Sequence, residues 1–181
     1  MRKVKYFVAN SLDNYIARKD GGMDWLFMDG TDYGMDEFFS SIDAVLLGRK
    51  TYEFALSQNP RPKKKSKKTK SDSGMKSYVF SQTIKDLGDE DAILVSENAG
   101  EFVRNLKKES GRDIWLMGGG GLVGSLLAEN VVDELSLNIH PVLLGSGVPL
   151  FPEFGRQLDL ELRECKAHKN GCVQVTYHVK N

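Results

Sequence analysis

The sequence predicts an α/β protein with a mostly parallel central sheet and an antiparallel hairpin near its C-terminal end. Over residues 3–142, short β-prone runs alternate with segments of helical periodicity, a pattern typical of parallel strands joined by crossover helices. The pattern then changes, because Leu158, Leu160 and Leu162 alternate with charged residues, and residues 173–179 alternate in a similar way. This alternation indicates two antiparallel strands with one solvated face.

Each element is predicted from its own residues. The hairpin turns at Asn170-Gly171, between Cys165 and Cys172. Because these are the only two cysteines, we expect free thiols in a reducing compartment, although a disulfide stays open, and we expect no structural metal site. The parallel strands are expected at Lys3–Ala9, Ala44–Gly48, Ser77–Phe80, Ala92–Val95, Asp113–Met117 and Glu134–Val142, and the helices at Met35–Ile42, Thr51–Ser57, Gly100–Glu109 and Leu122–Asn130.

Length and charge narrow the class of protein. A chain of 181 residues fits a single domain, residues 1–181, that buries about 70% of the surface of its unfolded form. The 25 basic and 25 acidic residues cancel, which gives no reason to expect nucleic acid or a membrane as partner. The first residues read as a charged strand and contain no apolar targeting run, so we expect a cytoplasmic protein.

One segment departs from the α/β pattern. Residues 59–74 contain seven Lys or Arg, two prolines and no apolar side chain. Such a segment has nothing to bury, which predicts a flexible Lys-rich surface loop. A solvated insertion is the simpler interpretation, and an electrostatic contact with an anionic partner is the alternative.

A glycine turn is the first candidate binding feature. Gly118–Gly121 lie between the expected strand at Asp113–Met117 and the expected helix at Leu122–Asn130. Glycine lets an anion approach the main chain, and N–H groups at a helix start lack intrahelical partners, so the turn suits a phosphate. A Rossmann site would need an acidic residue about 20 positions further on, but Ile139–Val142 occupy that region. We therefore expect a phosphate site without the Rossmann fold, and a tight loop without ligand is the alternative.

A second turn of the same kind occurs earlier in the chain. Gly48 ends an apolar strand and is followed by Arg49, Lys50 and Thr51 at a helix start. Gly48 permits backbone approach, the basic pair supplies positive charge, and Thr51 has a hydroxyl for a helix cap or a phosphate. Together with a third strand end at residues 81–83, the two turns predict an extended ligand with several phosphates.

In this order and at these spacings, the motifs resemble the dihydrofolate reductase-like fold. Within that fold they are most similar to the reductase domain at the C-terminus of bacterial riboflavin-biosynthesis deaminase-reductases. The resemblance spans nearly the whole chain and implies a three-layer α/β fold. The motifs that carry it are VANSLDNYIA (8–17), MDWL (23–26), GRKTY (48–52), FSQT (80–83), MGGGGLV (117–123) and IHPVLLGSGVPLF (139–151).

The resemblance implies NADPH as cofactor. Ala9 and Ile16 match positions that meet the nicotinamide, and Arg49 lies where a ribose phosphate would favour NADPH over NADH. The glycine turn matches a pyrophosphate site that in this fold often contains a cis Gly-Gly bond. The complete implied set is Ala9, Ile16, Gly48, Arg49, Lys50, Thr51, Ser81, Gln82, Gly118, Gly119, Gly120, Gly121, Leu122 and Val123, with Ser81 and Gln82 at the 2′-phosphate.

The resemblance also implies a proton donor and substrate contacts. Counting back from Gly48 by the family's spacing reaches Asp32 as the candidate acid, with Asp29 or Asp36 as alternatives if an insertion shifts the alignment. Asp36 also suits a purely structural role, since acids in the first turn of a helix stabilise its dipole. Trp25 and Phe39 are the candidate substrate contacts, although for Trp25 packing in the core or loop is the first interpretation and substrate contact the second.

These observations predict an NADPH-dependent reductase of a small heterocyclic or carbonyl substrate, riboflavin-precursor-like or pterin-like. The chain has no H-x-E with a paired C-x-x-C, so we expect no zinc deaminase activity. A dihydrofolate reductase proper and a non-catalytic nucleotide-binding module are the alternatives. We also expect a homodimer, because the family's reductases often dimerise and the apolar residues of 142–151 offer a surface for a second subunit.

Overall fold

The computed structural model describes residues 1–58, 74–88 and 92–180. The Lys-rich segment 59–74, apart from Gly74, lies outside the described residues, so its expected flexibility stays a prediction.

Eight strands form one sheet in the order β5-β4-β3-β6-β1-β7-β10-β9. All neighbouring pairs from β5 to β7 are parallel, whereas β10 is antiparallel to both β7 and β9. The predicted mostly parallel sheet with an antiparallel C-terminal hairpin is confirmed. The strands are β1 (Val4–Ser11), β3 (Ile42–Gly48), β4 (Lys76–Phe80), β5 (Ala92–Val95), β6 (Asp113–Gly118), β7 (Glu134–His140), β9 (Leu160–Ala167) and β10 (Val173–Val179).

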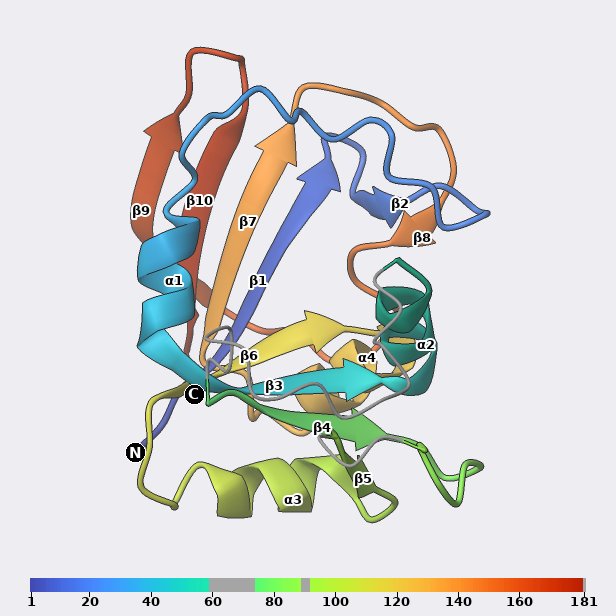
Figure 1. The fold of residues 1–181 in the computed structure, drawn as a ribbon. Coiled ribbons are helices and arrows are strands. Elements are labelled where there is room, and N and C mark those ends of the chain that lie inside the picture. The colour runs from blue at the N-terminus through green and yellow to red at the C-terminus, as the bar shows by residue number, and fades with distance from the viewer. Residues whose placement is uncertain (59–73, 89–91, 181) are drawn as a thin grey trace.

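Helices cover both faces of the sheet, which gives three layers (Figure 1). On one face, Phe38 of α1 stacks on Phe7 of β1 with ring centres 4.4 Å apart, and α2 packs through Tyr52. On the other face, Phe102 of α3 packs against Tyr78 of β4 at 5.2 Å, and α4 buries its leucines in the main core. The helices are α1 (Met35–Ser41), α2 (Arg49–Gln58), α3 (Ala99–Leu106) and α4 (Gly120–Ala128).

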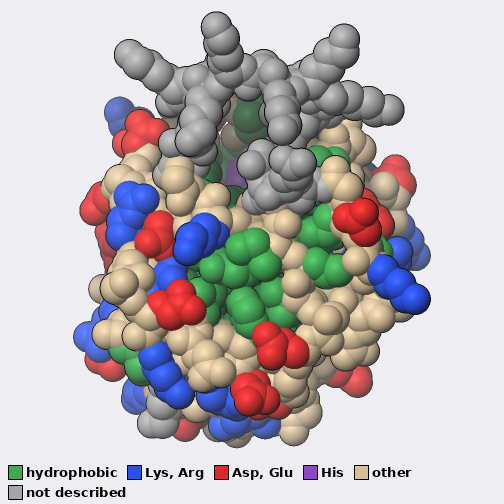
Figure 2. All heavy atoms as spheres, turned by 60° about the horizontal axis from the view of Figure 1, so that its bottom comes forward, with side chains coloured by type: hydrophobic (Ala, Val, Ile, Leu, Met, Phe, Trp, Pro, Cys, Tyr) green, Lys and Arg blue, Asp and Glu red, His purple; other side chains and the backbone are tan. Residues whose placement is uncertain are grey.

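The main core lies between the sheet and the layer of α3 and α4. Leu46, Ile114, Leu116 and Leu126 are fully buried there, because alternate residues of each strand face this layer. Hydrophobic side chains also gather on the surface: Figure 2 shows a central patch of them on one face, with charged side chains around it.

Two short strands were not predicted. β2 (Tyr15–Ala17) and β8 (Val148–Pro149) form a separate antiparallel pair, too short to show a period in the sequence. Next to them Leu150 N donates to Asn14 O at 2.8 Å, and the Leu150 side chain is buried in the core. Of the apolar residues in segment 142–151, Leu150 is therefore buried, whereas Leu143 is 72% exposed. In addition, β7 ends at His140 rather than Val142, because Pro141 has no N–H to donate.

The C-terminal hairpin turns at the predicted position. Gly171 has φ 88° and donates its N–H to His168 O at 3.0 Å, a conformation that suits glycine. Both cysteines are free, with Cys165 exposed on β9 and Cys172 buried. The expectation of free thiols is confirmed.

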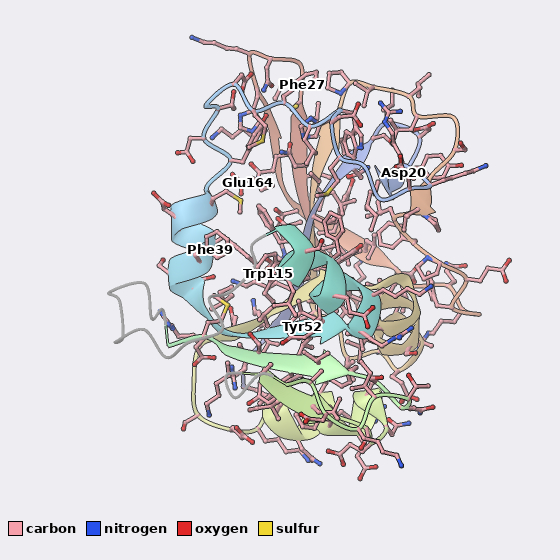
Figure 3. All side chains as sticks on the ribbon, turned by 45° about the vertical axis from the view of Figure 1, so that its right-hand side comes forward. Asp20, Phe27, Phe39, Tyr52, Trp115 and Glu164 are labelled. Carbon is pink, nitrogen blue, oxygen red and sulfur yellow. The ribbon has the colours of Figure 1, made fainter. Side chains whose placement is uncertain are left out.

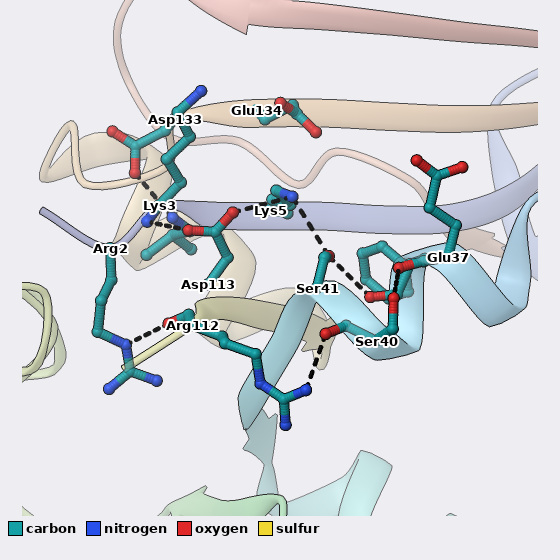
Figure 4. Close-up of polar contacts among 12 residues, drawn as sticks. Arg2, Lys3, Lys5, Glu37, Ser40, Ser41, Arg112, Asp113, Asp133 and Glu134 are labelled. Atoms are coloured by element: carbon teal, nitrogen blue, oxygen red, sulfur yellow. Dashed lines mark hydrogen bonds and ion pairs between the residues drawn. The ribbon is translucent and has the colours of Figure 1, made fainter. Parts of the chain in front are cut away.

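Charged side chains join the amino ends of the central strands. Asp113 of β6 accepts a hydrogen bond from Lys3 N at 2.9 Å and pairs with Lys5 Nζ at 2.9 Å (Figure 4). Asp133, just before β7, accepts from Val4 N at 2.7 Å and pairs with Lys107 Nζ at 2.7 Å. Because Lys107 is only 7% exposed, its charge depends on this carboxylate.

The loop between β2 and α1 is fastened to the C-terminal hairpin. The Asn170 amide nitrogen lies 3.0 Å from Asp29 Oδ2, 3.1 Å from Thr31 Oγ1 and 2.7 Å from Tyr33 Oη. Hydrogen bonds from Thr31 and Asn170 lower the pKa of Asp29 to about 2. One amide therefore ties together three side chains of the loop.

His140, at the end of β7, is buried beneath the same loop. Its ring packs edge-on against Trp25 and Phe27, at 5.4 and 5.2 Å between ring centres, and its Nδ1 lies 3.5 Å from Cys172 Sγ. Burial lowers the pKa of His140, and the Asp29 carboxylate opposes this effect. The imidazole is therefore neutral at pH 7.

Replacing Asp133 with Asn leaves the buried ammonium of Lys107 without its counterion. We expect the free energy of unfolding to fall by about 3 kcal/mol. This value is at the lower end of the losses seen when one partner of a buried ion pair is removed, because Asp133 is partly exposed. Urea denaturation measures this loss. Glu153→Gln, at an exposed position outside the helices, is the control and should change stability by less than about 0.5 kcal/mol. An Asp133→Asn loss no larger than the control would contradict the interpretation.

The buried His140 predicts that stability falls in mild acid. Its folded pKa lies below the unfolded value of about 6.5, so below that pH the unfolded chain binds more protons and the free energy of unfolding decreases. We expect the melting temperature to fall from pH 7 to pH 5, and by less in His140→Gln. Equal pH dependence in wild type and His140→Gln would exclude this role.

Candidate active site

The two predicted glycine turns meet at the carboxyl ends of neighbouring strands. β3 and β6 pair in parallel, so Gly48 at the end of β3 lies beside the turn that follows β6. A Cβ on Gly119 would lie 3.0 Å from Gly48 Cα, and a Cβ on Gly48 would lie 3.3 Å from Gly119 Cα. The two turns are in backbone contact, and neither position has room for a side chain without displacing the other.

The glycine turn combines a tight side with an open side. Gly118 and Gly119 have φ 132° and 102°, values that favour glycine. A Cβ at Gly118, Gly120 or Gly121 would meet no atom within 4 Å. The described residues contain only trans peptide bonds, so the cis Gly-Gly bond expected from the resemblance is absent. Beyond the contact with Gly48, the main chain of the turn is open to a ligand.

The start of α4 leaves donors at this open side. Val123 N donates to Gly119 O at 3.0 Å, so the N–H groups of the three residues before it have no partner within the helix. The side chains of Leu122 and Val123 are buried in the core. Leu122 can therefore contact a ligand only through its N–H. Val123 offers a ligand neither group, because its N–H is already bonded within the helix.

The basic residues of the second turn begin α2. Arg49 Nη1 lies 3.5 Å from Glu53 Oε1, and both side chains are more than 40% exposed, so this ion pair holds Arg49 only weakly. Lys50 is exposed. Thr51 Oγ1 lies 3.2 Å from the position of a Cβ on Gly119. Cationic side chains and a hydroxyl therefore border the contact between the two turns.

The third strand end, after β4, is organised by its own serine. Ser81 Oγ accepts hydrogen bonds from Thr83 N at 3.3 Å and Ile84 N at 3.1 Å, and Ser81 N donates to Val95 O. The Gln82 side chain is exposed. Because β4 is the neighbour of β3, this turn lies on the side of Gly48 away from the glycine turn.

The sheet divides beside these turns. β1 pairs with β6 over only three positions, ending at Tyr6–Leu116, whereas its pairing with β7 continues to Ser11–His140. Figure 1 shows β1 and β7 leaving the direction of β6 and β3. The Trp115 indole N–H donates to Phe7 O at 3.1 Å, so a side chain satisfies a carbonyl beyond the last paired position. The carboxyl ends of β1 and β6 are therefore not bonded to each other.

Ala9 lies on the part of β1 that has left β6. It pairs with Asn138 of β7, and Asn138 is 6% exposed with an amide oxygen that has no hydrogen-bond partner among the described residues. Ile16, on β2, is partly buried against the main core. A buried carbonyl without a donor is costly, so Asn138 marks a position where a donor from water or ligand is needed.

Aromatic side chains of α1, α2 and β6 gather on one face of the sheet. Phe39 of α1 packs edge-on against Trp115 of β6 at 5.6 Å and is 40% exposed, and Figure 3 shows these two residues together with Tyr52 of α2. Trp25 is 6% exposed and packs against His140; its indole nitrogen lacks a partner among the described residues. Of the two predicted substrate contacts, Phe39 is accessible and Trp25 is mainly a packing residue.

Both candidate acids lie on the surface. Asp32 is exposed and accepts a hydrogen bond from Gly34 N at 2.8 Å, just before α1. Asp36 is exposed in the first turn of α1, where a carboxylate stabilises the helix dipole. The alternative Asp29 is held by Asn170. The structure thus gives each carboxylate a local structural role, and the proton donor stays an open prediction.

Sequence reasoning missed two residues that the structure brings forward, Asn138 and Asn170. A signal for Asn138 existed, because Glu134, Ser136, Asn138 and His140 place a polar residue at every second position of a strand with neighbours on both sides. For Asn170 the only signal was its position in the predicted turn.

Within the described ranges no group of three or more His, Cys, Asp or Glu is placed to hold a metal ion, and no helix is both long and apolar enough to span a membrane.

Comparisons with known proteins agree with this architecture. The uncharacterized protein YyaP of Bacillus subtilis strain 168 is 37% identical over 180 residues, covering 98% of this chain and 95% of YyaP. A putative riboflavin biosynthesis protein from Shewanella sp. PV-4 is 28% identical, with a TM-score of 0.82 and full coverage of both chains. The dihydrofolate reductase of Enterococcus faecalis, solved with NADP(H) and RAB-propyl, shares 16% identity, with a TM-score of 0.69 and coverage of 99% and 97%.

The comparison with the folate enzyme shows the dihydrofolate reductase-like fold expected from the motifs. Residues 2–174 match the family described as RibD C-terminal domain. The chain therefore belongs to the RibD C-terminal domain family, an oxidoreductase family with the dihydrofolate reductase-like fold.

Proposed function

We propose that the protein is an NADPH-dependent reductase that transfers a hydride to a small heterocyclic or carbonyl substrate. The observation that carries the proposal is the contact between Gly48 and Gly119, which unites two phosphate-ready turns and leaves the main chain open at Gly118, Gly120 and Gly121. An extended anionic ligand fits this arrangement, because the first N–H groups of α4 face it without competing side chains.

The residues present fit a dinucleotide phosphate. The start of α4 would hold the pyrophosphate, Thr51 and the first turn of α2 would hold the adjoining phosphate, and Arg49 would reach the ribose phosphate with Ser81 and Gln82. When bound, NADPH would supply the hydride. The division of the sheet after Tyr6–Leu116 supports a nicotinamide position beside Ala9, since no strand bonds to β1 there on the side of β6.

The substrate side is supported by chemistry on the same part of the sheet. Asn138, beside Ala9, holds a buried carbonyl that needs a donor, which suits the N–H or O–H of a heterocycle that resembles a riboflavin precursor or a pterin. Phe39 offers an exposed ring beside Trp115 on which a planar heterocycle would stack.

The free thiols fit a reducing cytoplasm, where we place the reaction.

A dihydrofolate reductase proper is less well supported. The candidate acid Asp32 accepts the N–H of Gly34 at an exposed position, so no carboxylate among the three candidates is buried beside Ala9. We therefore favour the riboflavin-precursor-like class of substrate.

Fluorescence titration with NADPH and NADH tests the cofactor assignment. We expect NADPH to bind more tightly, and Arg49→Ala to weaken NADPH binding by about ten-fold, the loss of one charge-assisted hydrogen bond. Arg104→Ala is the control, because Arg104 lies on α3 and pairs with Glu129. Binding of neither nucleotide would overturn the proposal. Binding without oxidation of NADPH by dihydrofolate or by the pyrimidine precursors of riboflavin would favour the non-catalytic alternative.

Gly120→Ala tests the open side of the glycine turn. Its Cβ would meet no protein atom, and alanine suits a helix, so we expect unchanged or higher stability together with weaker NADPH binding. Gly119→Ala is the matched comparison: at φ 102° and 3.0 Å from Gly48 Cα, it should lower the free energy of unfolding by about 1–3 kcal/mol. Thermal denaturation and the same titration separate the two effects. Unaltered NADPH binding in Gly120→Ala would place the phosphates elsewhere.

A further inference from the structure

β9 is an amphipathic strand that has no partner on one side within the described part of the chain. It ends the eight-stranded sheet and pairs there only with β10 (Figure 1). All eight of its residues are exposed, including Leu160 at 40% and Leu162 at 54%. An edge strand presents a row of unpaired N–H and C=O groups, and here both faces of the strand are also uncovered.

A bulge at Arg163 sorts the side chains of β9 by type. Glu164 pairs with Thr176 and Leu162 with the next residue, Tyr177, so Arg163 is the extra residue. Arg163 Nε donates to His178 Nδ1 at 3.1 Å, and the guanidinium lies 3.2 Å from Glu161, which places Arg163 on the charged face. One face therefore carries Glu161, Arg163, Glu164 and Lys166, and the opposite face carries Leu160, Leu162, Cys165 and Ala167.

The order of residues along β9 is self-complementary. When two copies of the strand run antiparallel with Arg163 opposite Glu164, every charge meets the opposite sign and every apolar residue meets an apolar one. Because Arg163 is the extra residue in both copies, the two strands keep the same register on both sides of the bulge. The opposed pairs are Leu160 with Ala167, Glu161 with Lys166, Leu162 with Cys165, and Arg163 with Glu164.

Neighbouring registers are unfavourable. A shift of two residues in one direction places Glu161 opposite Glu164, and a shift in the other direction places Arg163 opposite Lys166. Like charges directly opposite each other destabilise paired strands. The order of charges thus selects one register.

We propose that β9 is the interface of a homodimer, in which the β9 strands of two copies pair antiparallel about a two-fold axis and join the two sheets. The two-fold axis repeats each favourable pair. Residue i of the first copy lies opposite residue j of the second, and residue j of the first lies opposite residue i of the second. The proposal places the expected dimer interface at this exposed edge instead of at segment 142–151, where Leu143 is 72% exposed but Leu150 is buried and Phe151 packs edge-on against Tyr6 at 6.2 Å. This inference does not depend on the proposed activity.

Charge reversal tests the register. Glu161→Lys and Lys166→Glu each place like charges opposite one another twice per dimer, so each should weaken dimerisation by about ten-fold or more, and the double variant should restore it. Within one strand, residues five positions apart are separated by about 16 Å, so rescue requires a second chain. Light scattering over a concentration series gives the dissociation constant. A monomeric wild type at every concentration, or a double variant no tighter than the single ones, would overturn the proposal.

A native cysteine provides a second test. In the proposed register Leu162→Cys brings a new thiol opposite Cys165 of the second copy, so mild oxidation should yield a covalent dimer on a non-reducing gel. Leu160→Cys, on the same face but opposite Ala167, should cross-link far less, because diagonal neighbours are about 7–8 Å apart. Leu162→Cys combined with Cys165→Ala should lose the cross-link between positions 162 and 165. Equal cross-linking by Leu162→Cys and Leu160→Cys would reject the register.

Discussion

The backbone contact between Gly48 and Gly119 is the constraint on which the candidate site depends. Two parallel strands approach so closely at their carboxyl ends that a Cβ on Gly119 would lie 3.0 Å from Gly48 Cα. This contact brings the starts of α2 and α4 side by side, so the N–H groups of both helix starts lie at the same edge of the sheet. Larger residues at these two positions would separate the turns. The two candidate phosphate sites would then no longer adjoin each other beside the division of the sheet between β6 and β1.

The paired charges and the candidate site occupy opposite ends of the same strands. At the amino ends, polar groups are paired: Asp113 bonds Lys3 N and Lys5, and Asp133 bonds Val4 N and Lys107. Near the carboxyl ends, glycines replace side chains and the Asn138 carbonyl has no partner in the described part of the chain. Crossover connections bring both turns to one edge of a parallel sheet. Polar groups at this edge can stay unpaired for a ligand, because the paired charges at the other end hold the strands in register.

The sequence predicted most of the fold because the signals were local. Alternation predicted the strands and the C-terminal hairpin, and the glycine turn before α4 followed from four consecutive glycines. What it missed depends on residues distant in the chain. β2 and β8 are defined only by each other, since each is too short to show a period. Asn170 ties down Asp29, some 140 positions earlier. For the candidate acids, a spacing argument located Asp32, but only the fold shows that it caps the turn before α1.

Polar alternation in β7 and β9 has different meanings because of where each strand lies. In β7 the polar face is largely buried, since Ser136 and Asn138 are 7% and 6% exposed, so the polar side chains on it need specific partners. Glu134 has His178 and Ser136 has Thr176, whereas the Asn138 carbonyl has no partner among the described residues. In β9, at the edge, a charged face is ordinary, and the unusual feature is the exposed apolar face opposite to it. An unpartnered group is therefore interpretable only when the topology is known: inside the sheet we assign it to the proposed ligand, and at the sheet edge to the proposed interface.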